Sequence, residues 1–210
     1  MKNKVYEVIK FYNMATSLKN VLRTGWLQWH VKSERIESVA EHIYGTMILA
    51  IAIESEFDSD IDLNKVLKML LIHELEEIII GDITPYQDVS NEEKLKMGVD
   101  AVNKVLDGFT KKEEYISLTN EFNEHITKES LFAFMCDKLE ADIQAKKYSL
   151  NEDVDIYSDE NMDLFNDERI QNMLKNGACD MGDLFIEHSK HCFKGEFLDI
   201  VNYVKNGDIL

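Results

Sequence analysis

The sequence contains few residues that interrupt or cross-link a fold. Its 210 residues include one proline and three cysteines, Cys136, Cys179 and Cys192, with no CxxC pair. An odd number of cysteines without such a pair indicates a reducing compartment and argues against a thiolate metal site. The near absence of proline, together with many Glu, Lys, Leu and Ile residues, favours a mainly helical fold.

Basic residues and long apolar runs are also scarce. The chain has 23 Lys and Arg residues against 40 Asp and Glu residues, a formal net charge of −17. Binding to a nucleic-acid backbone needs clustered basic residues, so nucleic acid is not an expected partner, although one arginine and a metal could hold a small phosphorylated substrate. The longest apolar run, Met47 to Ile53, is far shorter than the roughly 20 residues of a membrane span. Residues 1–12 lack the apolar segment of a signal peptide. We therefore expect a cytoplasmic protein without a membrane partner.

Helical periodicity, in contrast, is present along most of the chain. With 45% hydrophobic residues, the chain is long enough to bury a core without disulfides, and no linker or repeat divides it, so we expect one domain over residues 1–210. The apolar spacing predicts helices in residues 1–20, 38–54, 62–81, 90–106, 110–122 and 130–148. Shorter helices are expected near residues 168–174, 183–192 and 196–204. Residues 27–36 and 151–163 are expected to be loops.

Local signals mark several of these helix ends. Ser38 with Glu41 and Ser90 with Glu93 have the spacing of capping boxes, in which each side chain binds a backbone N–H at the start of a helix. Asp62 is a candidate N-cap in the same way. Gly81 is a natural C-terminal stop, because glycine adopts the backbone conformation that ends a helix.

The segment from Leu70 to Pro85 concentrates the polar chemistry of the chain. It carries His73 and four carboxylates among aliphatic residues: Glu74, Glu76, Glu77 and Asp82. On a continuous helix, His73 and Glu77 share one face. Buried acids need a partner, and a divalent metal would supply one. We expect Glu76 to be exposed, and Asp82 could be only a turn residue.

Four further residues could contribute to the same site, and each has a simpler explanation. His42 falls in the first turns of a buried helix, where a lone histidine is more often structural. Asp137 interrupts the apolar side of the helix over residues 130–148, and Lys138 is expected to point elsewhere, which leaves metal ligation open. Arg23 and Trp26 flank a turn and could hold a phosphate and a ring, although Trp26 could equally be a core aromatic.

The ordered set of motifs resembles the HD-domain phosphohydrolase superfamily, in particular the subgroup of bacterial 5′-deoxynucleotidases and HD-domain-containing protein 2. A histidine, a histidine–carboxylate pair and an aspartate follow one another on separate helices. The resemblance is carried by residues 18–26, 37–42, 73–77, 81–83, 92–94 and 137–140. It covers about residues 1–150, while residues 151–210 carry no matching motif.

This resemblance implies an all-α HD-domain helical bundle with additional C-terminal helices. It implies a phosphoric monoester hydrolase that releases phosphate from deoxyribonucleoside 5′-monophosphates, and a homodimer. One divalent ion (Mn, Co, Fe, Ni or Zn, with Mg possible) would be bound by a set of four residues: His42, His73, Glu74 and Asp137. Glu77 and Asp82 would be catalytic, Arg23 would bind phosphate and Trp26 would pack against the sugar.

Glu74 departs from the family pattern, which has aspartate after the second histidine. Glutamate can ligate the same hard cation, but its extra methylene shifts the carboxylate by about one carbon–carbon bond.

Three alternatives follow from the same residues. The substrate could be another small phosphoester, such as a nucleoside triphosphate or a cyclic nucleotide. The chain could also be an inactive HD module that binds a nucleotide or a partner, as the change at Glu74 permits. In the simplest alternative, the acidic residues only stabilise a helical bundle.

Overall fold

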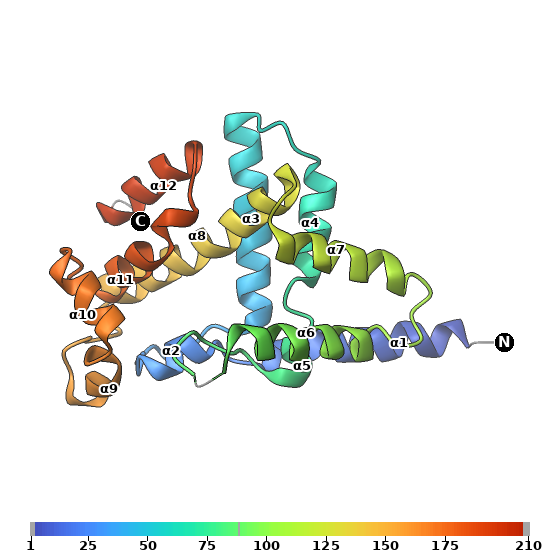
Figure 1. The fold of residues 1–210 in the computed structure, drawn as a ribbon, viewed down its shortest axis with the longest axis horizontal. Coiled ribbons are helices and arrows are strands. Elements are labelled where there is room, and N and C mark those ends of the chain that lie inside the picture. Colours follow the sequence, from blue (N-terminus) through green and yellow to red (C-terminus); the bar gives the residue numbers. More distant parts are fainter. Residues whose placement is uncertain (1–2, 88, 208–210) are drawn as a thin grey trace. The chain divides into compact units, whose positions relative to one another are not determined.

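The computed structural model describes residues 3–87 and 89–207, and these residues fold as helices (Figure 1). The only β-type pairing among them is an isolated antiparallel bridge between Leu22 and Ser38. The expectation of an all-α fold is therefore confirmed. Within this described part of the chain, no helix combines the length and low charge needed to cross a bilayer.

The chain divides into two compact units that are not continuous in sequence. Unit 1 contains residues 3–24, 37–87 and 89–134, and unit 2 contains residues 25–36 and 135–207. The chain therefore leaves unit 1 after Thr24, returns at Glu37 and leaves again within one long helix, α8 (Lys128–Leu150). The expectation of one domain over residues 1–210 stays a prediction.

Among its described residues, unit 1 contains six helices and one 3₁₀ segment before α8. In chain order they are α1 (Lys4–Ala15), η1 (Thr16–Asn20), α3 (Val39–Phe57), α4 (Leu63–Ile72), α5 (Glu77–Ile80), α6 (Asn91–Val105) and α7 (Lys112–Glu124). Helix α3 packs along α4, and α6 contacts α1, α5 and α7 (Figure 1). A short helix, α2 (Thr24–Gln28), begins at the first crossing between the units.

The expected helix starts are confirmed in unit 1. Ser38 and Glu41 form a complete capping box at α3, and Ser90 and Glu93 form one at α6. The side chain of Asp62 accepts a hydrogen bond from the Lys65 N–H at the start of α4. Each cap satisfies N–H groups that have no partner within the first turn of a helix.

The expected continuous helix over residues 62–81 is wrong in its middle. Helix α4 ends at Ile72, a turn follows over residues 73–76, and α5 ends at Gly81, whose φ is 73°. In the turn, a backbone N–H donates to the carbonyl three residues earlier instead of four, as the Leu75 N–H does to the Ile72 carbonyl. Nδ1 of the His73 ring also forms a hydrogen bond with the Leu70 carbonyl. In a continuous α-helix, this carbonyl would accept a hydrogen bond from the Glu74 N–H.

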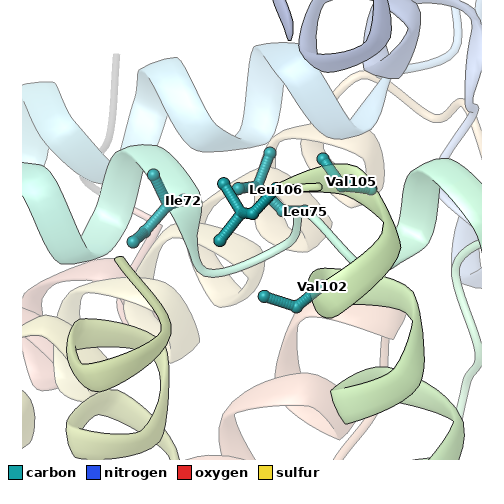
Figure 2. Packing of buried hydrophobic residues seen from close by; sticks show 5 residues of the cluster. All are labelled: Ile72, Leu75, Val102, Val105 and Leu106. Carbon is teal, nitrogen blue, oxygen red and sulfur yellow. The ribbon is translucent and has the colours of Figure 1, made fainter. Parts of the chain in front are cut away.

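Apolar packing holds both sides of this turn. Ile72 and Leu75 are buried against Val102, Val105 and Leu106 at the end of α6, as Figure 2 shows. Each such side chain contributes about 1.5–3 kcal/mol when it is fully removed from water. The polar residues between Ile72 and α5 are thus fixed by the core on which the turn rests.

Unit 2 is built from the second part of α8 and the helices that follow it. These are η2 (Asp159–Asn161), α9 (Met162–Phe165), α10 (Glu168–Lys175), α11 (Met181–Ser189), η3 (Lys190–Cys192) and α12 (Glu196–Lys205). Residues 25–36 complete the unit: Trp26 stacks on Phe185 and meets Tyr148 edge to face. The buried ammonium of Lys146 pairs with Asp180 and Asp183 at the start of α11.

Candidate metal centre

The first histidine of the candidate site is positioned by the start of α3. The Arg23 N–H donates to the Glu37 carbonyl at 3.0 Å, and the Val39 N–H donates to the Val21 carbonyl at 2.8 Å. This pair of bonds forms the bridge between the segment carrying Arg23 and the N-terminus of α3. His42 lies one turn into α3 and is fully buried, with 0% of its surface exposed.

The turn after α4 supplies a second histidine and a carboxylate. His73 is 3% exposed, and its ring centroid lies 5.8 Å from that of His42. Its Nε2 lies 3.5 Å from Oε1 of Glu74. One ligand atom from each of His42, His73 and Glu74 lies within 4.8 Å of those of the other two. Three of the residues expected to bind a metal are therefore brought together within unit 1.

The environment of the His73 ring fixes which nitrogen faces this cluster. Nδ1 lies 2.7 Å from the Leu70 carbonyl oxygen, which can only accept a hydrogen bond. In the neutral ring this assigns the hydrogen to Nδ1 and the lone pair to Nε2. A backbone carbonyl on one nitrogen and a metal on the other is the usual arrangement for a histidine ligand.

Two further carboxylates and an arginine adjoin the cluster. An Nη1 atom of Arg23 lies 3.8 Å from Oε1 of Glu74 and 3.8 Å from Oδ1 of Asp82. The backbone N–H of Thr24 donates to Oδ2 of Asp82 at 2.6 Å. Glu77 is 4% exposed, and its Oε2 atom has no hydrogen-bond partner among the described residues. The predicted catalytic and phosphate-binding residues of unit 1 thus lie around one centre.

This concentration of acid strongly affects protonation. Burial raises the pKa of Glu77 to about 11, and the carboxylates of Glu74 and Asp82 add to the effect while Arg23 opposes it. A cation among these groups would favour their ionised forms. Two buried imidazoles, a nearby carboxylate and a buried oxygen without a donor therefore fit a divalent metal, and this donor set suits transition metals.

Two predicted site residues belong to unit 2. Asp137, on α8, is 6% exposed, and Nζ of Lys138 lies 2.8 Å from its Oδ2. The expectation that Lys138 points elsewhere is therefore wrong: its long side chain bends back to the neighbouring carboxylate. Trp26 is 1% exposed, and its packing on Phe185 and Tyr148 favours the alternative of a core aromatic. Its role toward the sugar stays a prediction.

Glu76 and Lys94 differ from what the sequence alone suggests. Glu76 was expected to be exposed, which is wrong: the side chain is half-buried and packs beside Gly98 of α6. Lys94, in one of the resembling motifs, carries no predicted role, yet its Nζ donates to the Ile83 carbonyl at 2.7 Å. That bond ties α6 to the segment carrying Asp82. The motif around Lys94 was the signal in the sequence that this lysine has a role. Only the fold shows that the lysine binds the Ile83 carbonyl.

An all-α chain that buries two histidines beside carboxylates and an arginine has the features of a metal-dependent phosphohydrolase. The family described as HD domain matches residues 15–175 of this sequence. The chain therefore belongs to the HD-domain family, which confirms the resemblance carried by its motifs and the expected fold class. It is a hydrolase of phosphoric monoesters.

Relatives with assigned names match the same part of the chain. The 5′-deoxynucleotidase HDDC2 of Danio rerio is 33% identical over 144 residues, covering 67% of this chain and 69% of the relative. The protein of the same name from Dictyostelium discoideum is 30% identical over 147 residues, covering 67% and 76%. A solved structure titled as a conserved hypothetical protein from Pyrococcus furiosus has a TM-score of 0.61 at 25% identity. That similarity spans 94% of this chain and 99% of the other.

Proposed function

We propose that this chain is a metal-dependent 5′-deoxynucleotidase, which converts deoxyribonucleoside 5′-monophosphates to nucleoside and phosphate. The observation that carries the proposal is the buried cluster of His42, His73 and Glu74 with Arg23 beside it. Relatives named 5′-deoxynucleotidase match this chain over two thirds of its length. The site supports a metal-dependent phosphohydrolase, and the names of these relatives support a deoxyribonucleoside 5′-monophosphate as its substrate.

The proposed metal ligands are His42, His73, Glu74 and Asp137. The proximity of the first three within unit 1 supports their part. For Asp137 the support is its burial and its place in the ordered motif. The metal is one of Mn, Co, Fe, Ni or Zn, with Mg also compatible with the carboxylates. A divalent ion at this position supplies polarisation of the phosphoryl oxygens and acidification of a nearby water.

The surrounding side chains account for the remaining chemistry. Water attacks the phosphorus atom, the bond from phosphorus to the 5′ oxygen breaks, and that oxygen takes up a proton. Glu77 and Asp82 orient the water and transfer the protons. The Thr24 N–H holds the Asp82 carboxylate in place for this task. Arg23 binds the phosphate through its planar guanidinium, which matches two phosphate oxygens at once.

Assembly and location are further parts of the proposal. Helix α1 exposes several large apolar residues, which supports a homodimer in which this face is covered: Val5, Tyr6, Val8, Ile9 and Tyr12. Light scattering after size exclusion tests this state. The three cysteines all lack a disulfide, which is compatible with the proposed cytoplasmic location. Fractionation of cells followed by immunoblotting tests the location.

The function is tested by phosphate release from matched ribo- and deoxyribonucleoside 5′-monophosphates, after metal stripping and reloading with single metals. We expect activity only with metal and a preference for the deoxy substrates. His73→Ala should lose both bound metal and activity, whereas His125→Ala, a histidine outside the cluster, should retain both. Full metal content and turnover in His73→Ala would refute the assignment of His73 as a metal ligand. Activity confined to nucleoside triphosphates or cyclic nucleotides would show that the substrate is not a deoxyribonucleoside 5′-monophosphate.

A further inference from the structure

An aromatic side chain from α7 packs against the second histidine of the metal centre. The ring centroid of Phe122 lies 5.0 Å from that of His73, with an angle of 54° between the two planes. The two side chains are 7% and 3% exposed, so the contact lies in the interior of unit 1. The sequence predicts a helix that ends near Phe122 but assigns this residue no role. The contact therefore adds α7 to the elements that surround the metal centre.

The His73 ring needs a second constraint besides its hydrogen bond. Its Nδ1 lies 2.7 Å from the Leu70 carbonyl oxygen, which fixes the position of one ring atom. The torsion that sets the plane of a histidine ring has broad energy minima, so a single hydrogen bond leaves the ring free to tilt about the bonded atom. Such a tilt moves Nε2, which lies on the opposite side of the ring and 3.5 Å from Oε1 of Glu74.

The ring of Phe122 restricts this tilting. Its distance from the His73 ring falls within the 4.5–7 Å between centroids that aromatic pairs prefer, and the two rings are tilted rather than face to face. Rotation of the imidazole plane would lose this arrangement or force the rings into overlap, because side chains in protein interiors are closely packed.

Phe122 is itself held by the end of α7. His125 caps this helix with a φ of 50°, and its ring centroid lies 5.8 Å from that of Phe122 at an angle of 85°. The His125 ring stacks in turn on Phe134, with 3.9 Å between the centroids. Helix α7 also packs along α4, the helix that ends next to His73 (Figure 1). The Phe122 ring is thus supported by elements other than the turn that carries His73.

We propose that Phe122 is a positioning residue of the metal centre, whose ring holds the plane of the His73 imidazole and so keeps Nε2 directed at the metal. This role rests on the proposed ligation of the metal by His73. A core aromatic without this role would contribute to the stability of unit 1 and would leave the affinity and geometry of the bound metal unchanged.

Titration of the metal-stripped 210-residue chain with Co²⁺ tests the proposal. Competition with a chromophoric chelator gives the affinity, and the visible absorption of the bound ion reports its coordination geometry. Phe122→Leu keeps an apolar side chain but removes the flat ring. We expect it to bind Co²⁺ about tenfold more weakly, with an altered absorption spectrum at saturation. Phe122→Tyr retains the ring and should keep the wild-type spectrum and an affinity within about twofold of wild type.

Phe109→Leu is the matched control. Phe109 stacks on Phe11 with 4.5 Å between the centroids, and it packs against the core that contains Ile72 and Leu75 on either side of the turn. Its loss should lower the urea midpoint of unit 1, followed by circular dichroism, and leave the affinity and spectrum of Co²⁺ unchanged. If Phe122→Leu does not fold, Phe122→Met takes its place, because its unbranched side chain fills irregular space without a ring.

The outcomes separate the role of Phe122 from the metal centre itself. Wild-type affinity and spectrum in Phe122→Leu, or equal changes in Phe122→Leu and Phe109→Leu, would overturn the role of Phe122 alone. Absence of Co²⁺ binding in the wild-type protein, or unchanged binding in His73→Ala, would show that His73 is not a ligand, and the role of Phe122 would fail with it.

Discussion

Replacing Asp142 with asparagine should make the stability of unit 2 less sensitive to a rise in pH from about 4 to 8. Asp142 lies on α8, is 2% exposed, and its Oδ2 is 2.5 Å from the hydroxyl oxygen of Ser189. Burial raises its pKa from an ordinary 3.8 to about 8, while the bond from Ser189 and the charge of Lys138 oppose the rise. The protonated side chain has the shape of an asparagine, so the substitution preserves the packing.

The sign and size of the effect follow from proton linkage. Below about pH 4 Asp142 is protonated in both states, and its contribution to stability is fully present. As the pH rises toward 8, the unfolded chain releases this proton and the folded chain retains it, so stability falls by at most about 1.4 kcal/mol per pH unit. Above the folded pKa the loss levels off. Asp142→Asn avoids this loss, so its advantage should grow to the order of 5 kcal/mol at pH 8.

Tryptophan fluorescence during urea unfolding measures this effect specifically. The chain has two tryptophans, Trp26 and Trp29, and both lie buried in unit 2. Unfolding curves at four pH values between 5 and 8 give the free energy of unfolding of the wild-type protein and of Asp142→Asn. Titrations of other groups cancel in the difference between these two free energies. Ser189→Ala is the control. It keeps the carboxyl group of Asp142 and removes the hydrogen bond from Ser189, which lowers the pKa of that carboxyl group. Parallel pH profiles for wild type and Asp142→Asn would refute the reasoning.

Three other predictions concern the metal centre. Arg23→Lys should lower kcat/KM by about 10–100-fold, because a point charge replaces a fork that binds two oxygens; an unchanged kcat/KM would remove Arg23 from phosphate binding. Lys94→Met should reduce kcat by about tenfold through loss of the bond to the Ile83 carbonyl, and Lys94→Arg should restore most of it; equal rates in both variants would contradict a positioning role. Glu74→Asp should keep stoichiometric metal in elemental analysis with an affinity changed by about tenfold or more, whereas Glu74→Ala should lose it; metal retained by Glu74→Ala would exclude ligation by this residue.

Helix starts and the all-α class could be predicted because their causes are local. The capping boxes at Ser38 and Ser90 require only residues three positions apart, and both form. Gly81 likewise ends α5 in a positive-φ conformation. Patterns of this kind are readable in the chain before any long-range contact is known.

The interruption at His73 could not be predicted in the same way. Apolar residues continue at helical spacing through residues 70–80, so the pattern favours one helix. The turn depends on the His73 ring meeting the Leu70 carbonyl and on the core at the end of α6. The contact of Lys138 with Asp137 and the burial of Trp26 likewise depend on side-chain conformation and on residues distant in sequence.

The division of unit 2 between an early and a late segment has a consequence during synthesis. Trp26 leaves the ribosome early, but its stacking partner Phe185 follows about 160 residues later, roughly 8–30 s at the usual rates of translation. Contacts so distant in sequence also carry a large loop-closure cost, which slows their formation. Two large aromatic side chains, Trp26 and Trp29, are therefore exposed while most of unit 1 is already available to fold. A chaperone that binds apolar segments would find its target in this interval at residues 25–36.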